Sequence, residues 1–134
     1  MKTEQELIDL IISYEAACEL RGVTPLTIED FAKHPEEDRD SDFASHQLNV
    51  ICSAFWNGEK IDYTNFRQKK YEIIWVWNEN TAGGSGFSFG GVLCLASASF
   101  VGARHSYPSD RIARIGATRF VDIYNRFLSP YKPK

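Results

Sequence analysis

The stretch Tyr71-Glu72-Ile73-Ile74-Trp75-Val76-Trp77-Asn78 decides the fold class, because it is the clearest β-strand in the sequence. It is rich in β-branched and aromatic residues and contains neither glycine nor proline. Strand alternation places four large side chains on one face: Tyr71, Ile73, Trp75 and Trp77. Because the opposite face is also partly apolar, we predict that this strand lies in the interior of a sheet.

Two further strands are predicted after it. Residues 87–95 form the second strand, with a bulky face expected to pack against helices and a small face opposite. The bulky face is predicted to hold Phe87, Phe89, Leu93 and Leu95. Residues 97–107 form the third strand, interrupted at Gly102. We expect these strands to pair in sequence order, as a three-stranded antiparallel meander.

The first half of the chain is predicted to be helical. A capping box, T-x-x-E at residues 3–6, opens a helix that continues to a glycine stop at Gly22. Thr27 is expected to cap a short helical turn. Apolar residues at helical spacing from Phe43 to Phe55 then predict a second long helix that ends at Asn57-Gly58. The acidic stretch before it, residues 35–42, is either a loop or the charged entry to this helix, with Asp40 or Ser41 as a possible cap.

A last amphipathic helix is predicted from Asp110 to Leu128. The fold class is therefore α+β, with about three helices packed mainly on one face of the sheet. We expect one domain over residues 1–134. Its parts are a helical segment (1–58), the sheet (70–107) and a C-terminal helix (109–129).

Charge is distributed unevenly along the chain. The net charge is −3, but residues 1–62 carry five basic and fourteen acidic side chains. Residues 100–134 carry seven basic and two acidic side chains. Such polarity either steers a partner or lets neighbouring elements neutralise each other, and we favour the second interpretation.

Cysteine usage indicates a reducing compartment. The three cysteines, Cys18, Cys52 and Cys94, are widely spaced among apolar residues, and we expect buried free thiols. No Cys/His spacing matches a zinc site, so we expect no metal and no cofactor. The N-terminus does not resemble a signal peptide, and no apolar run is long enough to span a bilayer. We therefore expect a cytoplasmic protein without a membrane partner.

The glycine-rich run GGSGFSFGG, residues 83–91, does not fit a phosphate-binding loop. A P-loop requires a Lys-Ser/Thr pair and a following helix, whereas a strand is predicted here. Residues 86–90 match the G-x-S-x-G pattern of a serine nucleophile, but the strand-to-helix context of that motif is missing. We interpret the run as a turn between strands and assign no catalytic residue.

Binding is the function that the sequence favours. Tryptophan and arginine dominate interface hot spots, although tryptophans in a strand more often belong to the core. The candidate binding residues are Trp75, Trp77, Arg104, His105, Arg111 and Arg114. We expect contacts to a protein partner, or to a second copy of the chain, through the aromatic sheet or the basic last helix.

Two alternatives are kept. A single-stranded nucleic-acid binder would use the arginines near and on the last helix, namely Arg104, Arg111, Arg114 and Arg119. A small-molecule-binding protein or small enzyme would instead use Arg104 and His105 beside the glycine-rich turn.

Several motifs occur in order along nearly the whole chain. They are Y-E-A-A-C (14–18), A-F-W-N-G (54–58), K-Y (70–71) before the tryptophan-rich strand, G-F-S-F (86–89), V-G-A-R (101–104) and F-V-D-I-Y-N-R-F-L (120–128). This ordered set resembles a family of small uncharacterised proteins of Bacteroides-type gut bacteria and their phages. The chain departs from that pattern in two places. Residues 90–100 are apolar where the family is polar, and residues 105–108 replace a Leu-Cys-Phe-like strand.

The resemblance implies a context and no catalytic residue. It implies a bacterial or phage accessory or structural protein, located in the host cytoplasm or in the virion. Together with the residue patterns, it leads us to expect a non-catalytic protein that acts through protein contacts.

Overall fold

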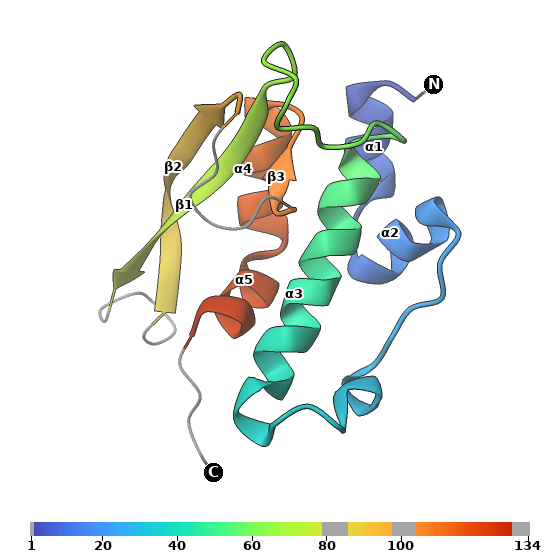
Figure 1. Ribbon diagram of the computed structural model, residues 1–134, viewed down its shortest axis with the longest axis vertical. Coiled ribbons are helices and arrows are strands. Elements are labelled where there is room, and N and C mark those ends of the chain that lie inside the picture. The colour runs from blue at the N-terminus through green and yellow to red at the C-terminus, as the bar shows by residue number, and fades with distance from the viewer. Residues whose placement is uncertain (1, 79–85, 98–103, 130–134) are drawn as a thin grey trace.

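The computed structural model describes residues 2–78, 86–97 and 104–129, and within them an antiparallel sheet lies beside a group of helices (Figure 1). The strands are β1 (Lys70–Asn78), β2 (Gly86–Leu95) and β3 (Ser106–Tyr107). The helices are α1 (Glu4–Leu10), α2 (Tyr14–Arg21), the 3-10 turn η1 (Ile28–Phe31), α3 (Glu36–Phe55), α4 (Asp110–Arg119) and α5 (Val121–Leu128). The predicted α+β class is confirmed, but these residues form five α-helices where about three were predicted.

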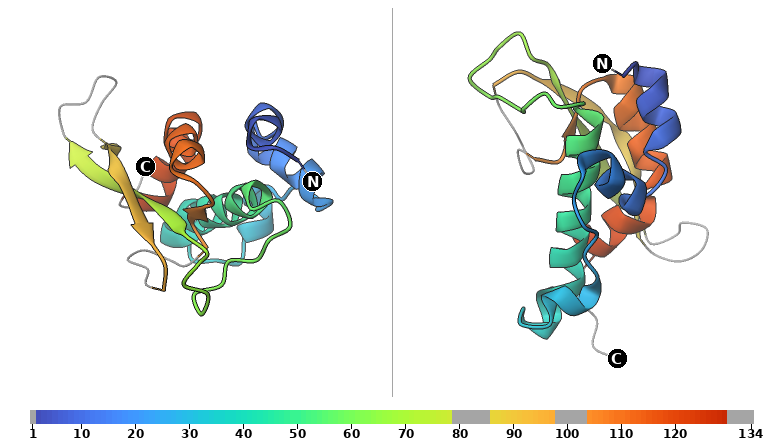
Figure 2. Two further views of the ribbon diagram at one scale, coloured as in Figure 1. Left: turned by 90° about the horizontal axis from the view of Figure 1, so that it is seen from above. Right: turned by 90° about the vertical axis from the view of Figure 1, so that its right-hand side faces the viewer.

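The helices lie on one side of the sheet and form successive layers (Figure 2). Helices α4 and α5 pack directly on β1 and β2, and α3 packs against α5. Helix α2 packs on the far side of α3, and α1 lies near it. The apolar core fills the space between these layers, with Ile11, Leu48, Ile51 and Phe55 among its most buried members.

The first predicted helix is two helices. The capping box is confirmed, because the Thr3 hydroxyl accepts from the Glu6 N–H at 3.2 Å while the Glu6 carboxylate accepts from the Thr3 N–H at 3.2 Å. Helix α1 nevertheless ends at Leu10. Ser13 then starts α2 as an N-cap, since its hydroxyl accepts from the Ala16 N–H at 3.0 Å.

The two other predicted long helices also have different bounds. Helix α3 begins at Glu36, so the acidic stretch is the charged entry to the helix and not a loop, and neither Asp40 nor Ser41 is its cap. Three acidic residues lie in a first turn whose free N–H groups favour negative charge. The last helix is broken at Phe120, which has φ −114° and ψ 23°. Phe120 is buried, so the break places an aromatic side chain in the core. The predicted short turn after Thr27 is the η1 segment.

The predicted meander is wrong. The strand order is β2-β1-β3, so β3 pairs with β1 and not with its sequence neighbour β2. β1 is therefore the central strand, as its two apolar faces predicted. Only Ser106 and Tyr107 of the predicted third strand are in β3, and residues 98–103 lie outside the described residues. The position beside β1 brings Tyr107 into the core, where its hydroxyl lies 2.5 Å from that of Tyr124.

A β-bulge overturns the predicted faces of β2. Trp75 pairs with Phe89 and Ile74 pairs with Gly91, so Gly90 is the extra residue. Side-chain direction therefore switches at Gly90. Phe87 and Phe89 share a face with Val92 and Cys94, and not with Leu93 and Leu95. A Cβ at Gly90 would lie 2.7 Å from Val76 Cγ2, which explains why the strand is thin there.

The cysteines are free, and two of them are buried as predicted. Cys18 and Cys52 are in the core, whereas Cys94 is exposed. The prediction is wrong for Cys94 because it lies on β2, an edge strand of the sheet.

Candidate functional site

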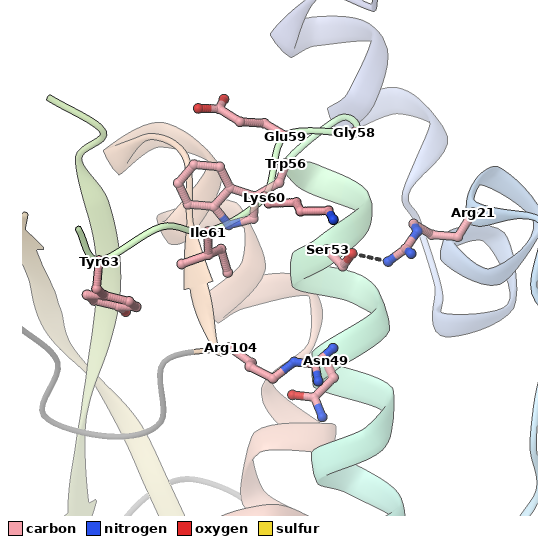
Figure 3. A pocket seen from close by; sticks show the side chains of 10 residues that line it. All are labelled: Arg21, Asn49, Ser53, Trp56, Gly58, Glu59, Lys60, Ile61, Tyr63 and Arg104. Carbon is pink, nitrogen blue, oxygen red and sulfur yellow. Dashed lines mark hydrogen bonds between the residues drawn. The ribbon is translucent and has the colours of Figure 1, made fainter. Parts of the chain in front are cut away.

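A cavity of about 510 Å³ with a mixed polar and apolar lining lies beside the C-terminal half of α3 (Figure 3). Three segments of the chain line it: the end of α2, α3 together with the connection that follows it, and the residue Arg104. Its lining comprises Arg21 at the end of α2, Asn49, Ser53 and Trp56 at α3, the residues Gly58, Glu59, Lys60, Ile61 and Tyr63 of the following connection, and Arg104 before β3. We call it the basic cavity.

Two features fix the connection that lines the basic cavity. Asn57 (φ 56°) and Gly58 (φ 87°) adopt left-handed conformations that end α3 and redirect the chain. Gln68 is almost fully buried, and its side-chain amide forms hydrogen bonds to three residues of the connection. It donates to the Glu59 carboxylate (2.9 Å) and the Lys60 carbonyl (2.7 Å), and it accepts from the Asp62 N–H (2.7 Å).

The charges around the basic cavity are mainly positive. Arg21, Lys60 and Arg104 are cationic, and Glu59 is the one acid that lines it. The Arg21 guanidinium donates to the Ser53 hydroxyl. Within the described parts of the chain, neither Lys60 nor Arg104 makes a side-chain hydrogen bond or ion pair. In Figure 3 the Glu59 carboxylate points away from Arg21 and Arg104.

A buried polar cluster lies behind Tyr63. Lys70 has no exposed surface, and its ammonium donates to the carbonyls of Asp62 (2.5 Å), Asn65 (3.1 Å) and Ala96 (2.6 Å). The same ammonium lies 4.9 Å from the centre of the Tyr63 ring, whose hydroxyl donates to the buried Glu72 carboxylate at 3.3 Å. These contacts fasten the connection onto the sheet, so we assign Lys70 a structural role.

Arg104 and His105, predicted to act together, line different cavities. His105 lines a smaller, mainly apolar cavity of about 270 Å³ with Trp75, Tyr124 and Phe127. Its ring packs edge-on against Phe127 with centroids 5.1 Å apart. Burial lowers the pKa of His105, so its imidazole is neutral at neutral pH.

The two candidate tryptophans have different environments. Trp75 stacks against Tyr124 of α5, with ring centroids 4.8 Å apart. Trp77 is 40% exposed and contacts Phe87 edge-on at 5.2 Å. Three other large side chains at this end are also exposed: Ile74 (38%), Val76 (51%) and Phe89 (42%). We call Ile74, Val76, Trp77 and Phe89 the apolar end of the sheet.

The arginines of the last helices mostly contact the protein itself. Arg111 donates to the Gln5 side chain at 2.5 Å. Arg114 is exposed, pairs with Asp110 at 2.8 Å and lies over the Phe89 ring at 5.5 Å. Arg119 donates to the carbonyls of Ile8 (2.6 Å) and Ile11 (3.0 Å), which satisfies the C-terminal end of α1.

The other two histidines have partners of their own, and both contact the Phe31 ring. His46 shares a 2.8 Å hydrogen bond with Tyr14, and His34 contacts Asp42 at 2.8 Å. Among the described residues, no three His, Cys, Asp or Glu side chains lie close enough to hold a metal ion.

The sequence reasoning identified Arg104 but missed Arg21 and Lys60. No local pattern singles them out, because each is an isolated cation in an acidic half of the chain. They meet Arg104 only through the packing of α2 on α3 and the path of the connection.

Comparison with known proteins gives no relative for this chain. No protein-family model, no curated protein and no solved structure matches it. Among the described residues, no helix has the length and hydropathy needed to cross a bilayer.

Proposed function

We propose that this chain is a non-catalytic accessory protein that binds another protein through the apolar end of its sheet. The observation that carries the proposal is the exposure of Ile74, Val76, Trp77 and Phe89 on two neighbouring strands. Each face of the sheet here exposes two large apolar side chains close together, and neighbouring exposed apolar side chains indicate an interaction surface, whereas single exposed residues are ordinary. A bacterial or phage accessory protein, the context that the resemblance implies, would act in this way.

The exposed apolar side chains lie on both faces of the sheet, which supports binding of a partner that contacts both faces around the sheet edge. Trp77 and Phe89 project from the face on which α4 and α5 pack, and Ile74 and Val76 project from the opposite face. Trp75 lies two residues before Trp77 on the same face of β1, and its ring is covered by Tyr124. The helical cover therefore stops short of Trp77, and a bound apolar segment would complete it.

The single-stranded nucleic-acid alternative has less support. Arg119 is engaged with the carbonyls of α1, and Arg114 with Asp110. Phosphate binding by these side chains would compete with those contacts.

The test compares capture of proteins by two matched baits from lysate of cells that carry the gene. Val76→Lys places a charge on the apolar end of the sheet, and Val23→Lys makes the same change at another exposed valine. We expect a protein retained by the unchanged chain and by Val23→Lys to be lost with Val76→Lys. The interaction is then repeated with the purified partner. Equal capture by both variants, or none by the unchanged chain, would contradict the proposal.

A further inference from the structure

We infer that the basic cavity is a binding site for a small organic phosphate, separate from the apolar end of the sheet. The first observation is charge. Arg21, Lys60 and Arg104 line one cavity of about 510 Å³ in a chain whose net charge is −3. The overall composition therefore does not account for a local excess of positive charge.

The second observation is that two of these cations have no partner. Lys60 and Arg104 make no ion pair or side-chain hydrogen bond within the parts of the chain that the structure describes. By contrast, Arg39, Arg111, Arg114 and Arg119 each donate to a named oxygen within the protein. Lys60 and Arg104 are thus free to donate hydrogen bonds to the oxygens of a ligand.

The third observation is the direction of the side chains. In Figure 3, Lys60 and Arg21 extend toward Ser53, and the Arg104 guanidinium lies beside the Asn49 amide. The positive groups thus gather along one face of α3. The acid that lines the cavity, Glu59, points away and accepts from Gln68 at 2.9 Å. A carboxylate placed there opposes anion binding less than one placed among the cations would.

The chemistry of the lining favours a phosphate group with an organic body. Guanidinium groups match phosphate oxygens bidentately, and lysine supplies a compact positive charge. Ser53 and Asn49 add neutral hydrogen-bonding groups. The half-buried side chains of Ile61 and Tyr63 form an apolar wall, and the volume lies in the range of ordinary small-molecule sites. A phosphorylated nucleoside or sugar fits this combination better than a bare inorganic ion.

Trp56 at the base of the cavity offers a bound ligand neither its indole N–H nor more than a small part of its ring surface. That N–H donates to the Ser106 carbonyl at 2.9 Å, and Trp56 is only 3% exposed. The indole is therefore fixed in place. Recognition would come from the cations, Ser53 and Asn49, and phosphate charge would dominate affinity.

Calorimetric titration of the full chain tests the inference with AMP, ADP, glucose 6-phosphate, inorganic phosphate and adenosine as probes. We expect saturable binding of at least one organic phosphate with a Kd below about 1 mM, and binding at least about tenfold weaker for adenosine and for inorganic phosphate. Raising the salt concentration weakens the binding of the phosphorylated probe. A 5′-phosphorylated oligonucleotide is titrated alongside them.

Three variants locate the site. Lys60→Gln and Arg104→Gln each remove a cation without an internal partner, so they leave the fold intact and weaken phosphate binding about tenfold or more. Arg114→Gln, an exposed arginine outside the basic cavity, leaves binding unchanged. Thermal unfolding of each variant checks that the fold is kept.

Several results would overturn the inference. They are the absence of saturable binding up to about 10 mM of every phosphorylated probe, equal binding of adenosine, inorganic phosphate binding as tightly as the organic phosphates (an adventitious ion only), or binding unaffected by both Lys60→Gln and Arg104→Gln. An oligonucleotide that binds more tightly than every mononucleotide would assign the surface to nucleic acid instead. None of these results depends on whether the apolar end of the sheet binds a protein.

Discussion

The side-chain amide of Asn125 on α5 pairs with both backbone hydrogen-bonding groups of Phe87 on β2. The Phe87 N–H donates to Asn125 Oδ1 at 2.7 Å, and Asn125 Nδ2 donates to the Phe87 carbonyl at 3.2 Å. The amide thus imitates one residue of a neighbouring strand at the outer edge of β2. Gly86 permits the approach, because a Cβ there would lie 2.8 Å from Asn125 Oδ1.

Replacing Asn125 with alanine is expected to lower the free energy of unfolding by about 1–3 kcal/mol, because the Phe87 N–H and carbonyl lose their partners. Urea denaturation measures the change. Asp122→Ala, on the exposed side of the same helix, serves as the control and is expected to change stability by less than about 0.5 kcal/mol. Equal effects of the two changes would show that the amide pairing contributes little.

The Gly90 bulge gives a second prediction. A Cβ at position 90 would lie 2.7 Å from Val76 Cγ2 and 3.2 Å from the Ile74 carbonyl oxygen. Gly90→Ala is therefore expected to destabilise the protein by about 1–3 kcal/mol through overpacking. Adding Val76→Ala removes the closest clash and recovers part of the loss, which denaturation of the single and double variants measures. A double variant as unstable as the sum of the two single changes would contradict this explanation.

How much of this sheet was predictable depends on whether the signal is local. The strand character and interior position of β1 follow from its own composition and alternation. The bulge depends on what Gly90 meets across the strand pair, so sequence alternation alone assigned Leu93 and Leu95 to the wrong face. Likewise, Trp75 and Trp77 are equivalent in sequence, and only the extent of the helical cover separates them.

The same distinction between local and distant signals applies to the helices and the basic cavity. The capping box at Thr3 and the stop at Gly22 are local signals, and both are confirmed. The break before Ser13 was missed, because Arg119, more than one hundred positions away, satisfies the carbonyls at the end of α1. Arg104 was predicted as one of several candidate arginines. Its position in one cavity with Arg21 and Lys60 depends on the packing of three segments of the chain.

Arg119 is expected to be a structural residue. Arg119→Ala removes two charge-assisted hydrogen bonds to the carbonyls of Ile8 and Ile11, which is expected to cost about 1.5–3 kcal/mol in the free energy of unfolding. Arg111→Ala removes an exposed contact to Gln5 and is expected to cost less than about 0.5 kcal/mol. Denaturation of the two variants side by side makes the comparison. If Arg119→Ala leaves the free energy of unfolding unchanged, Arg119 is not a structural residue and is available to contact an external partner.

Alkaline pH is expected to destabilise the core through its buried hydroxyls and thiol. Burial raises the pKa of Tyr107 and Tyr124 well above 10.0 and raises the pKa of Cys52 to about 12. A folded-state pKa above the unfolded value means that the unfolded chain releases its proton first as pH rises. The stability from these groups is therefore nearly complete below about pH 8, where the thiol of the unfolded chain begins to ionise, and falls above it.

Unfolding free energies at about pH 8 and about pH 11 measure this effect. The double variant Tyr107→Phe/Tyr124→Phe removes two of the buried titrating groups, so it is expected to lose less stability than the unchanged chain between these pH values. Tyr14, whose pKa burial also raises to about 12, is present in both proteins. Exposed tyrosines and lysines contribute equally to both proteins and cancel in the comparison. Identical pH dependence would show that the buried tyrosine pair is not responsible.

Contact between the apolar end of the sheet and a protein partner is detected by site-specific photo-cross-linking in cells that carry the gene. A photoreactive phenylalanine analogue is placed at position 76, and in a separate variant at position 23, also an exposed valine. We expect a discrete cross-linked protein from position 76 that is absent from position 23. Adducts that are the same from both positions, or that are missing at position 76, would contradict it.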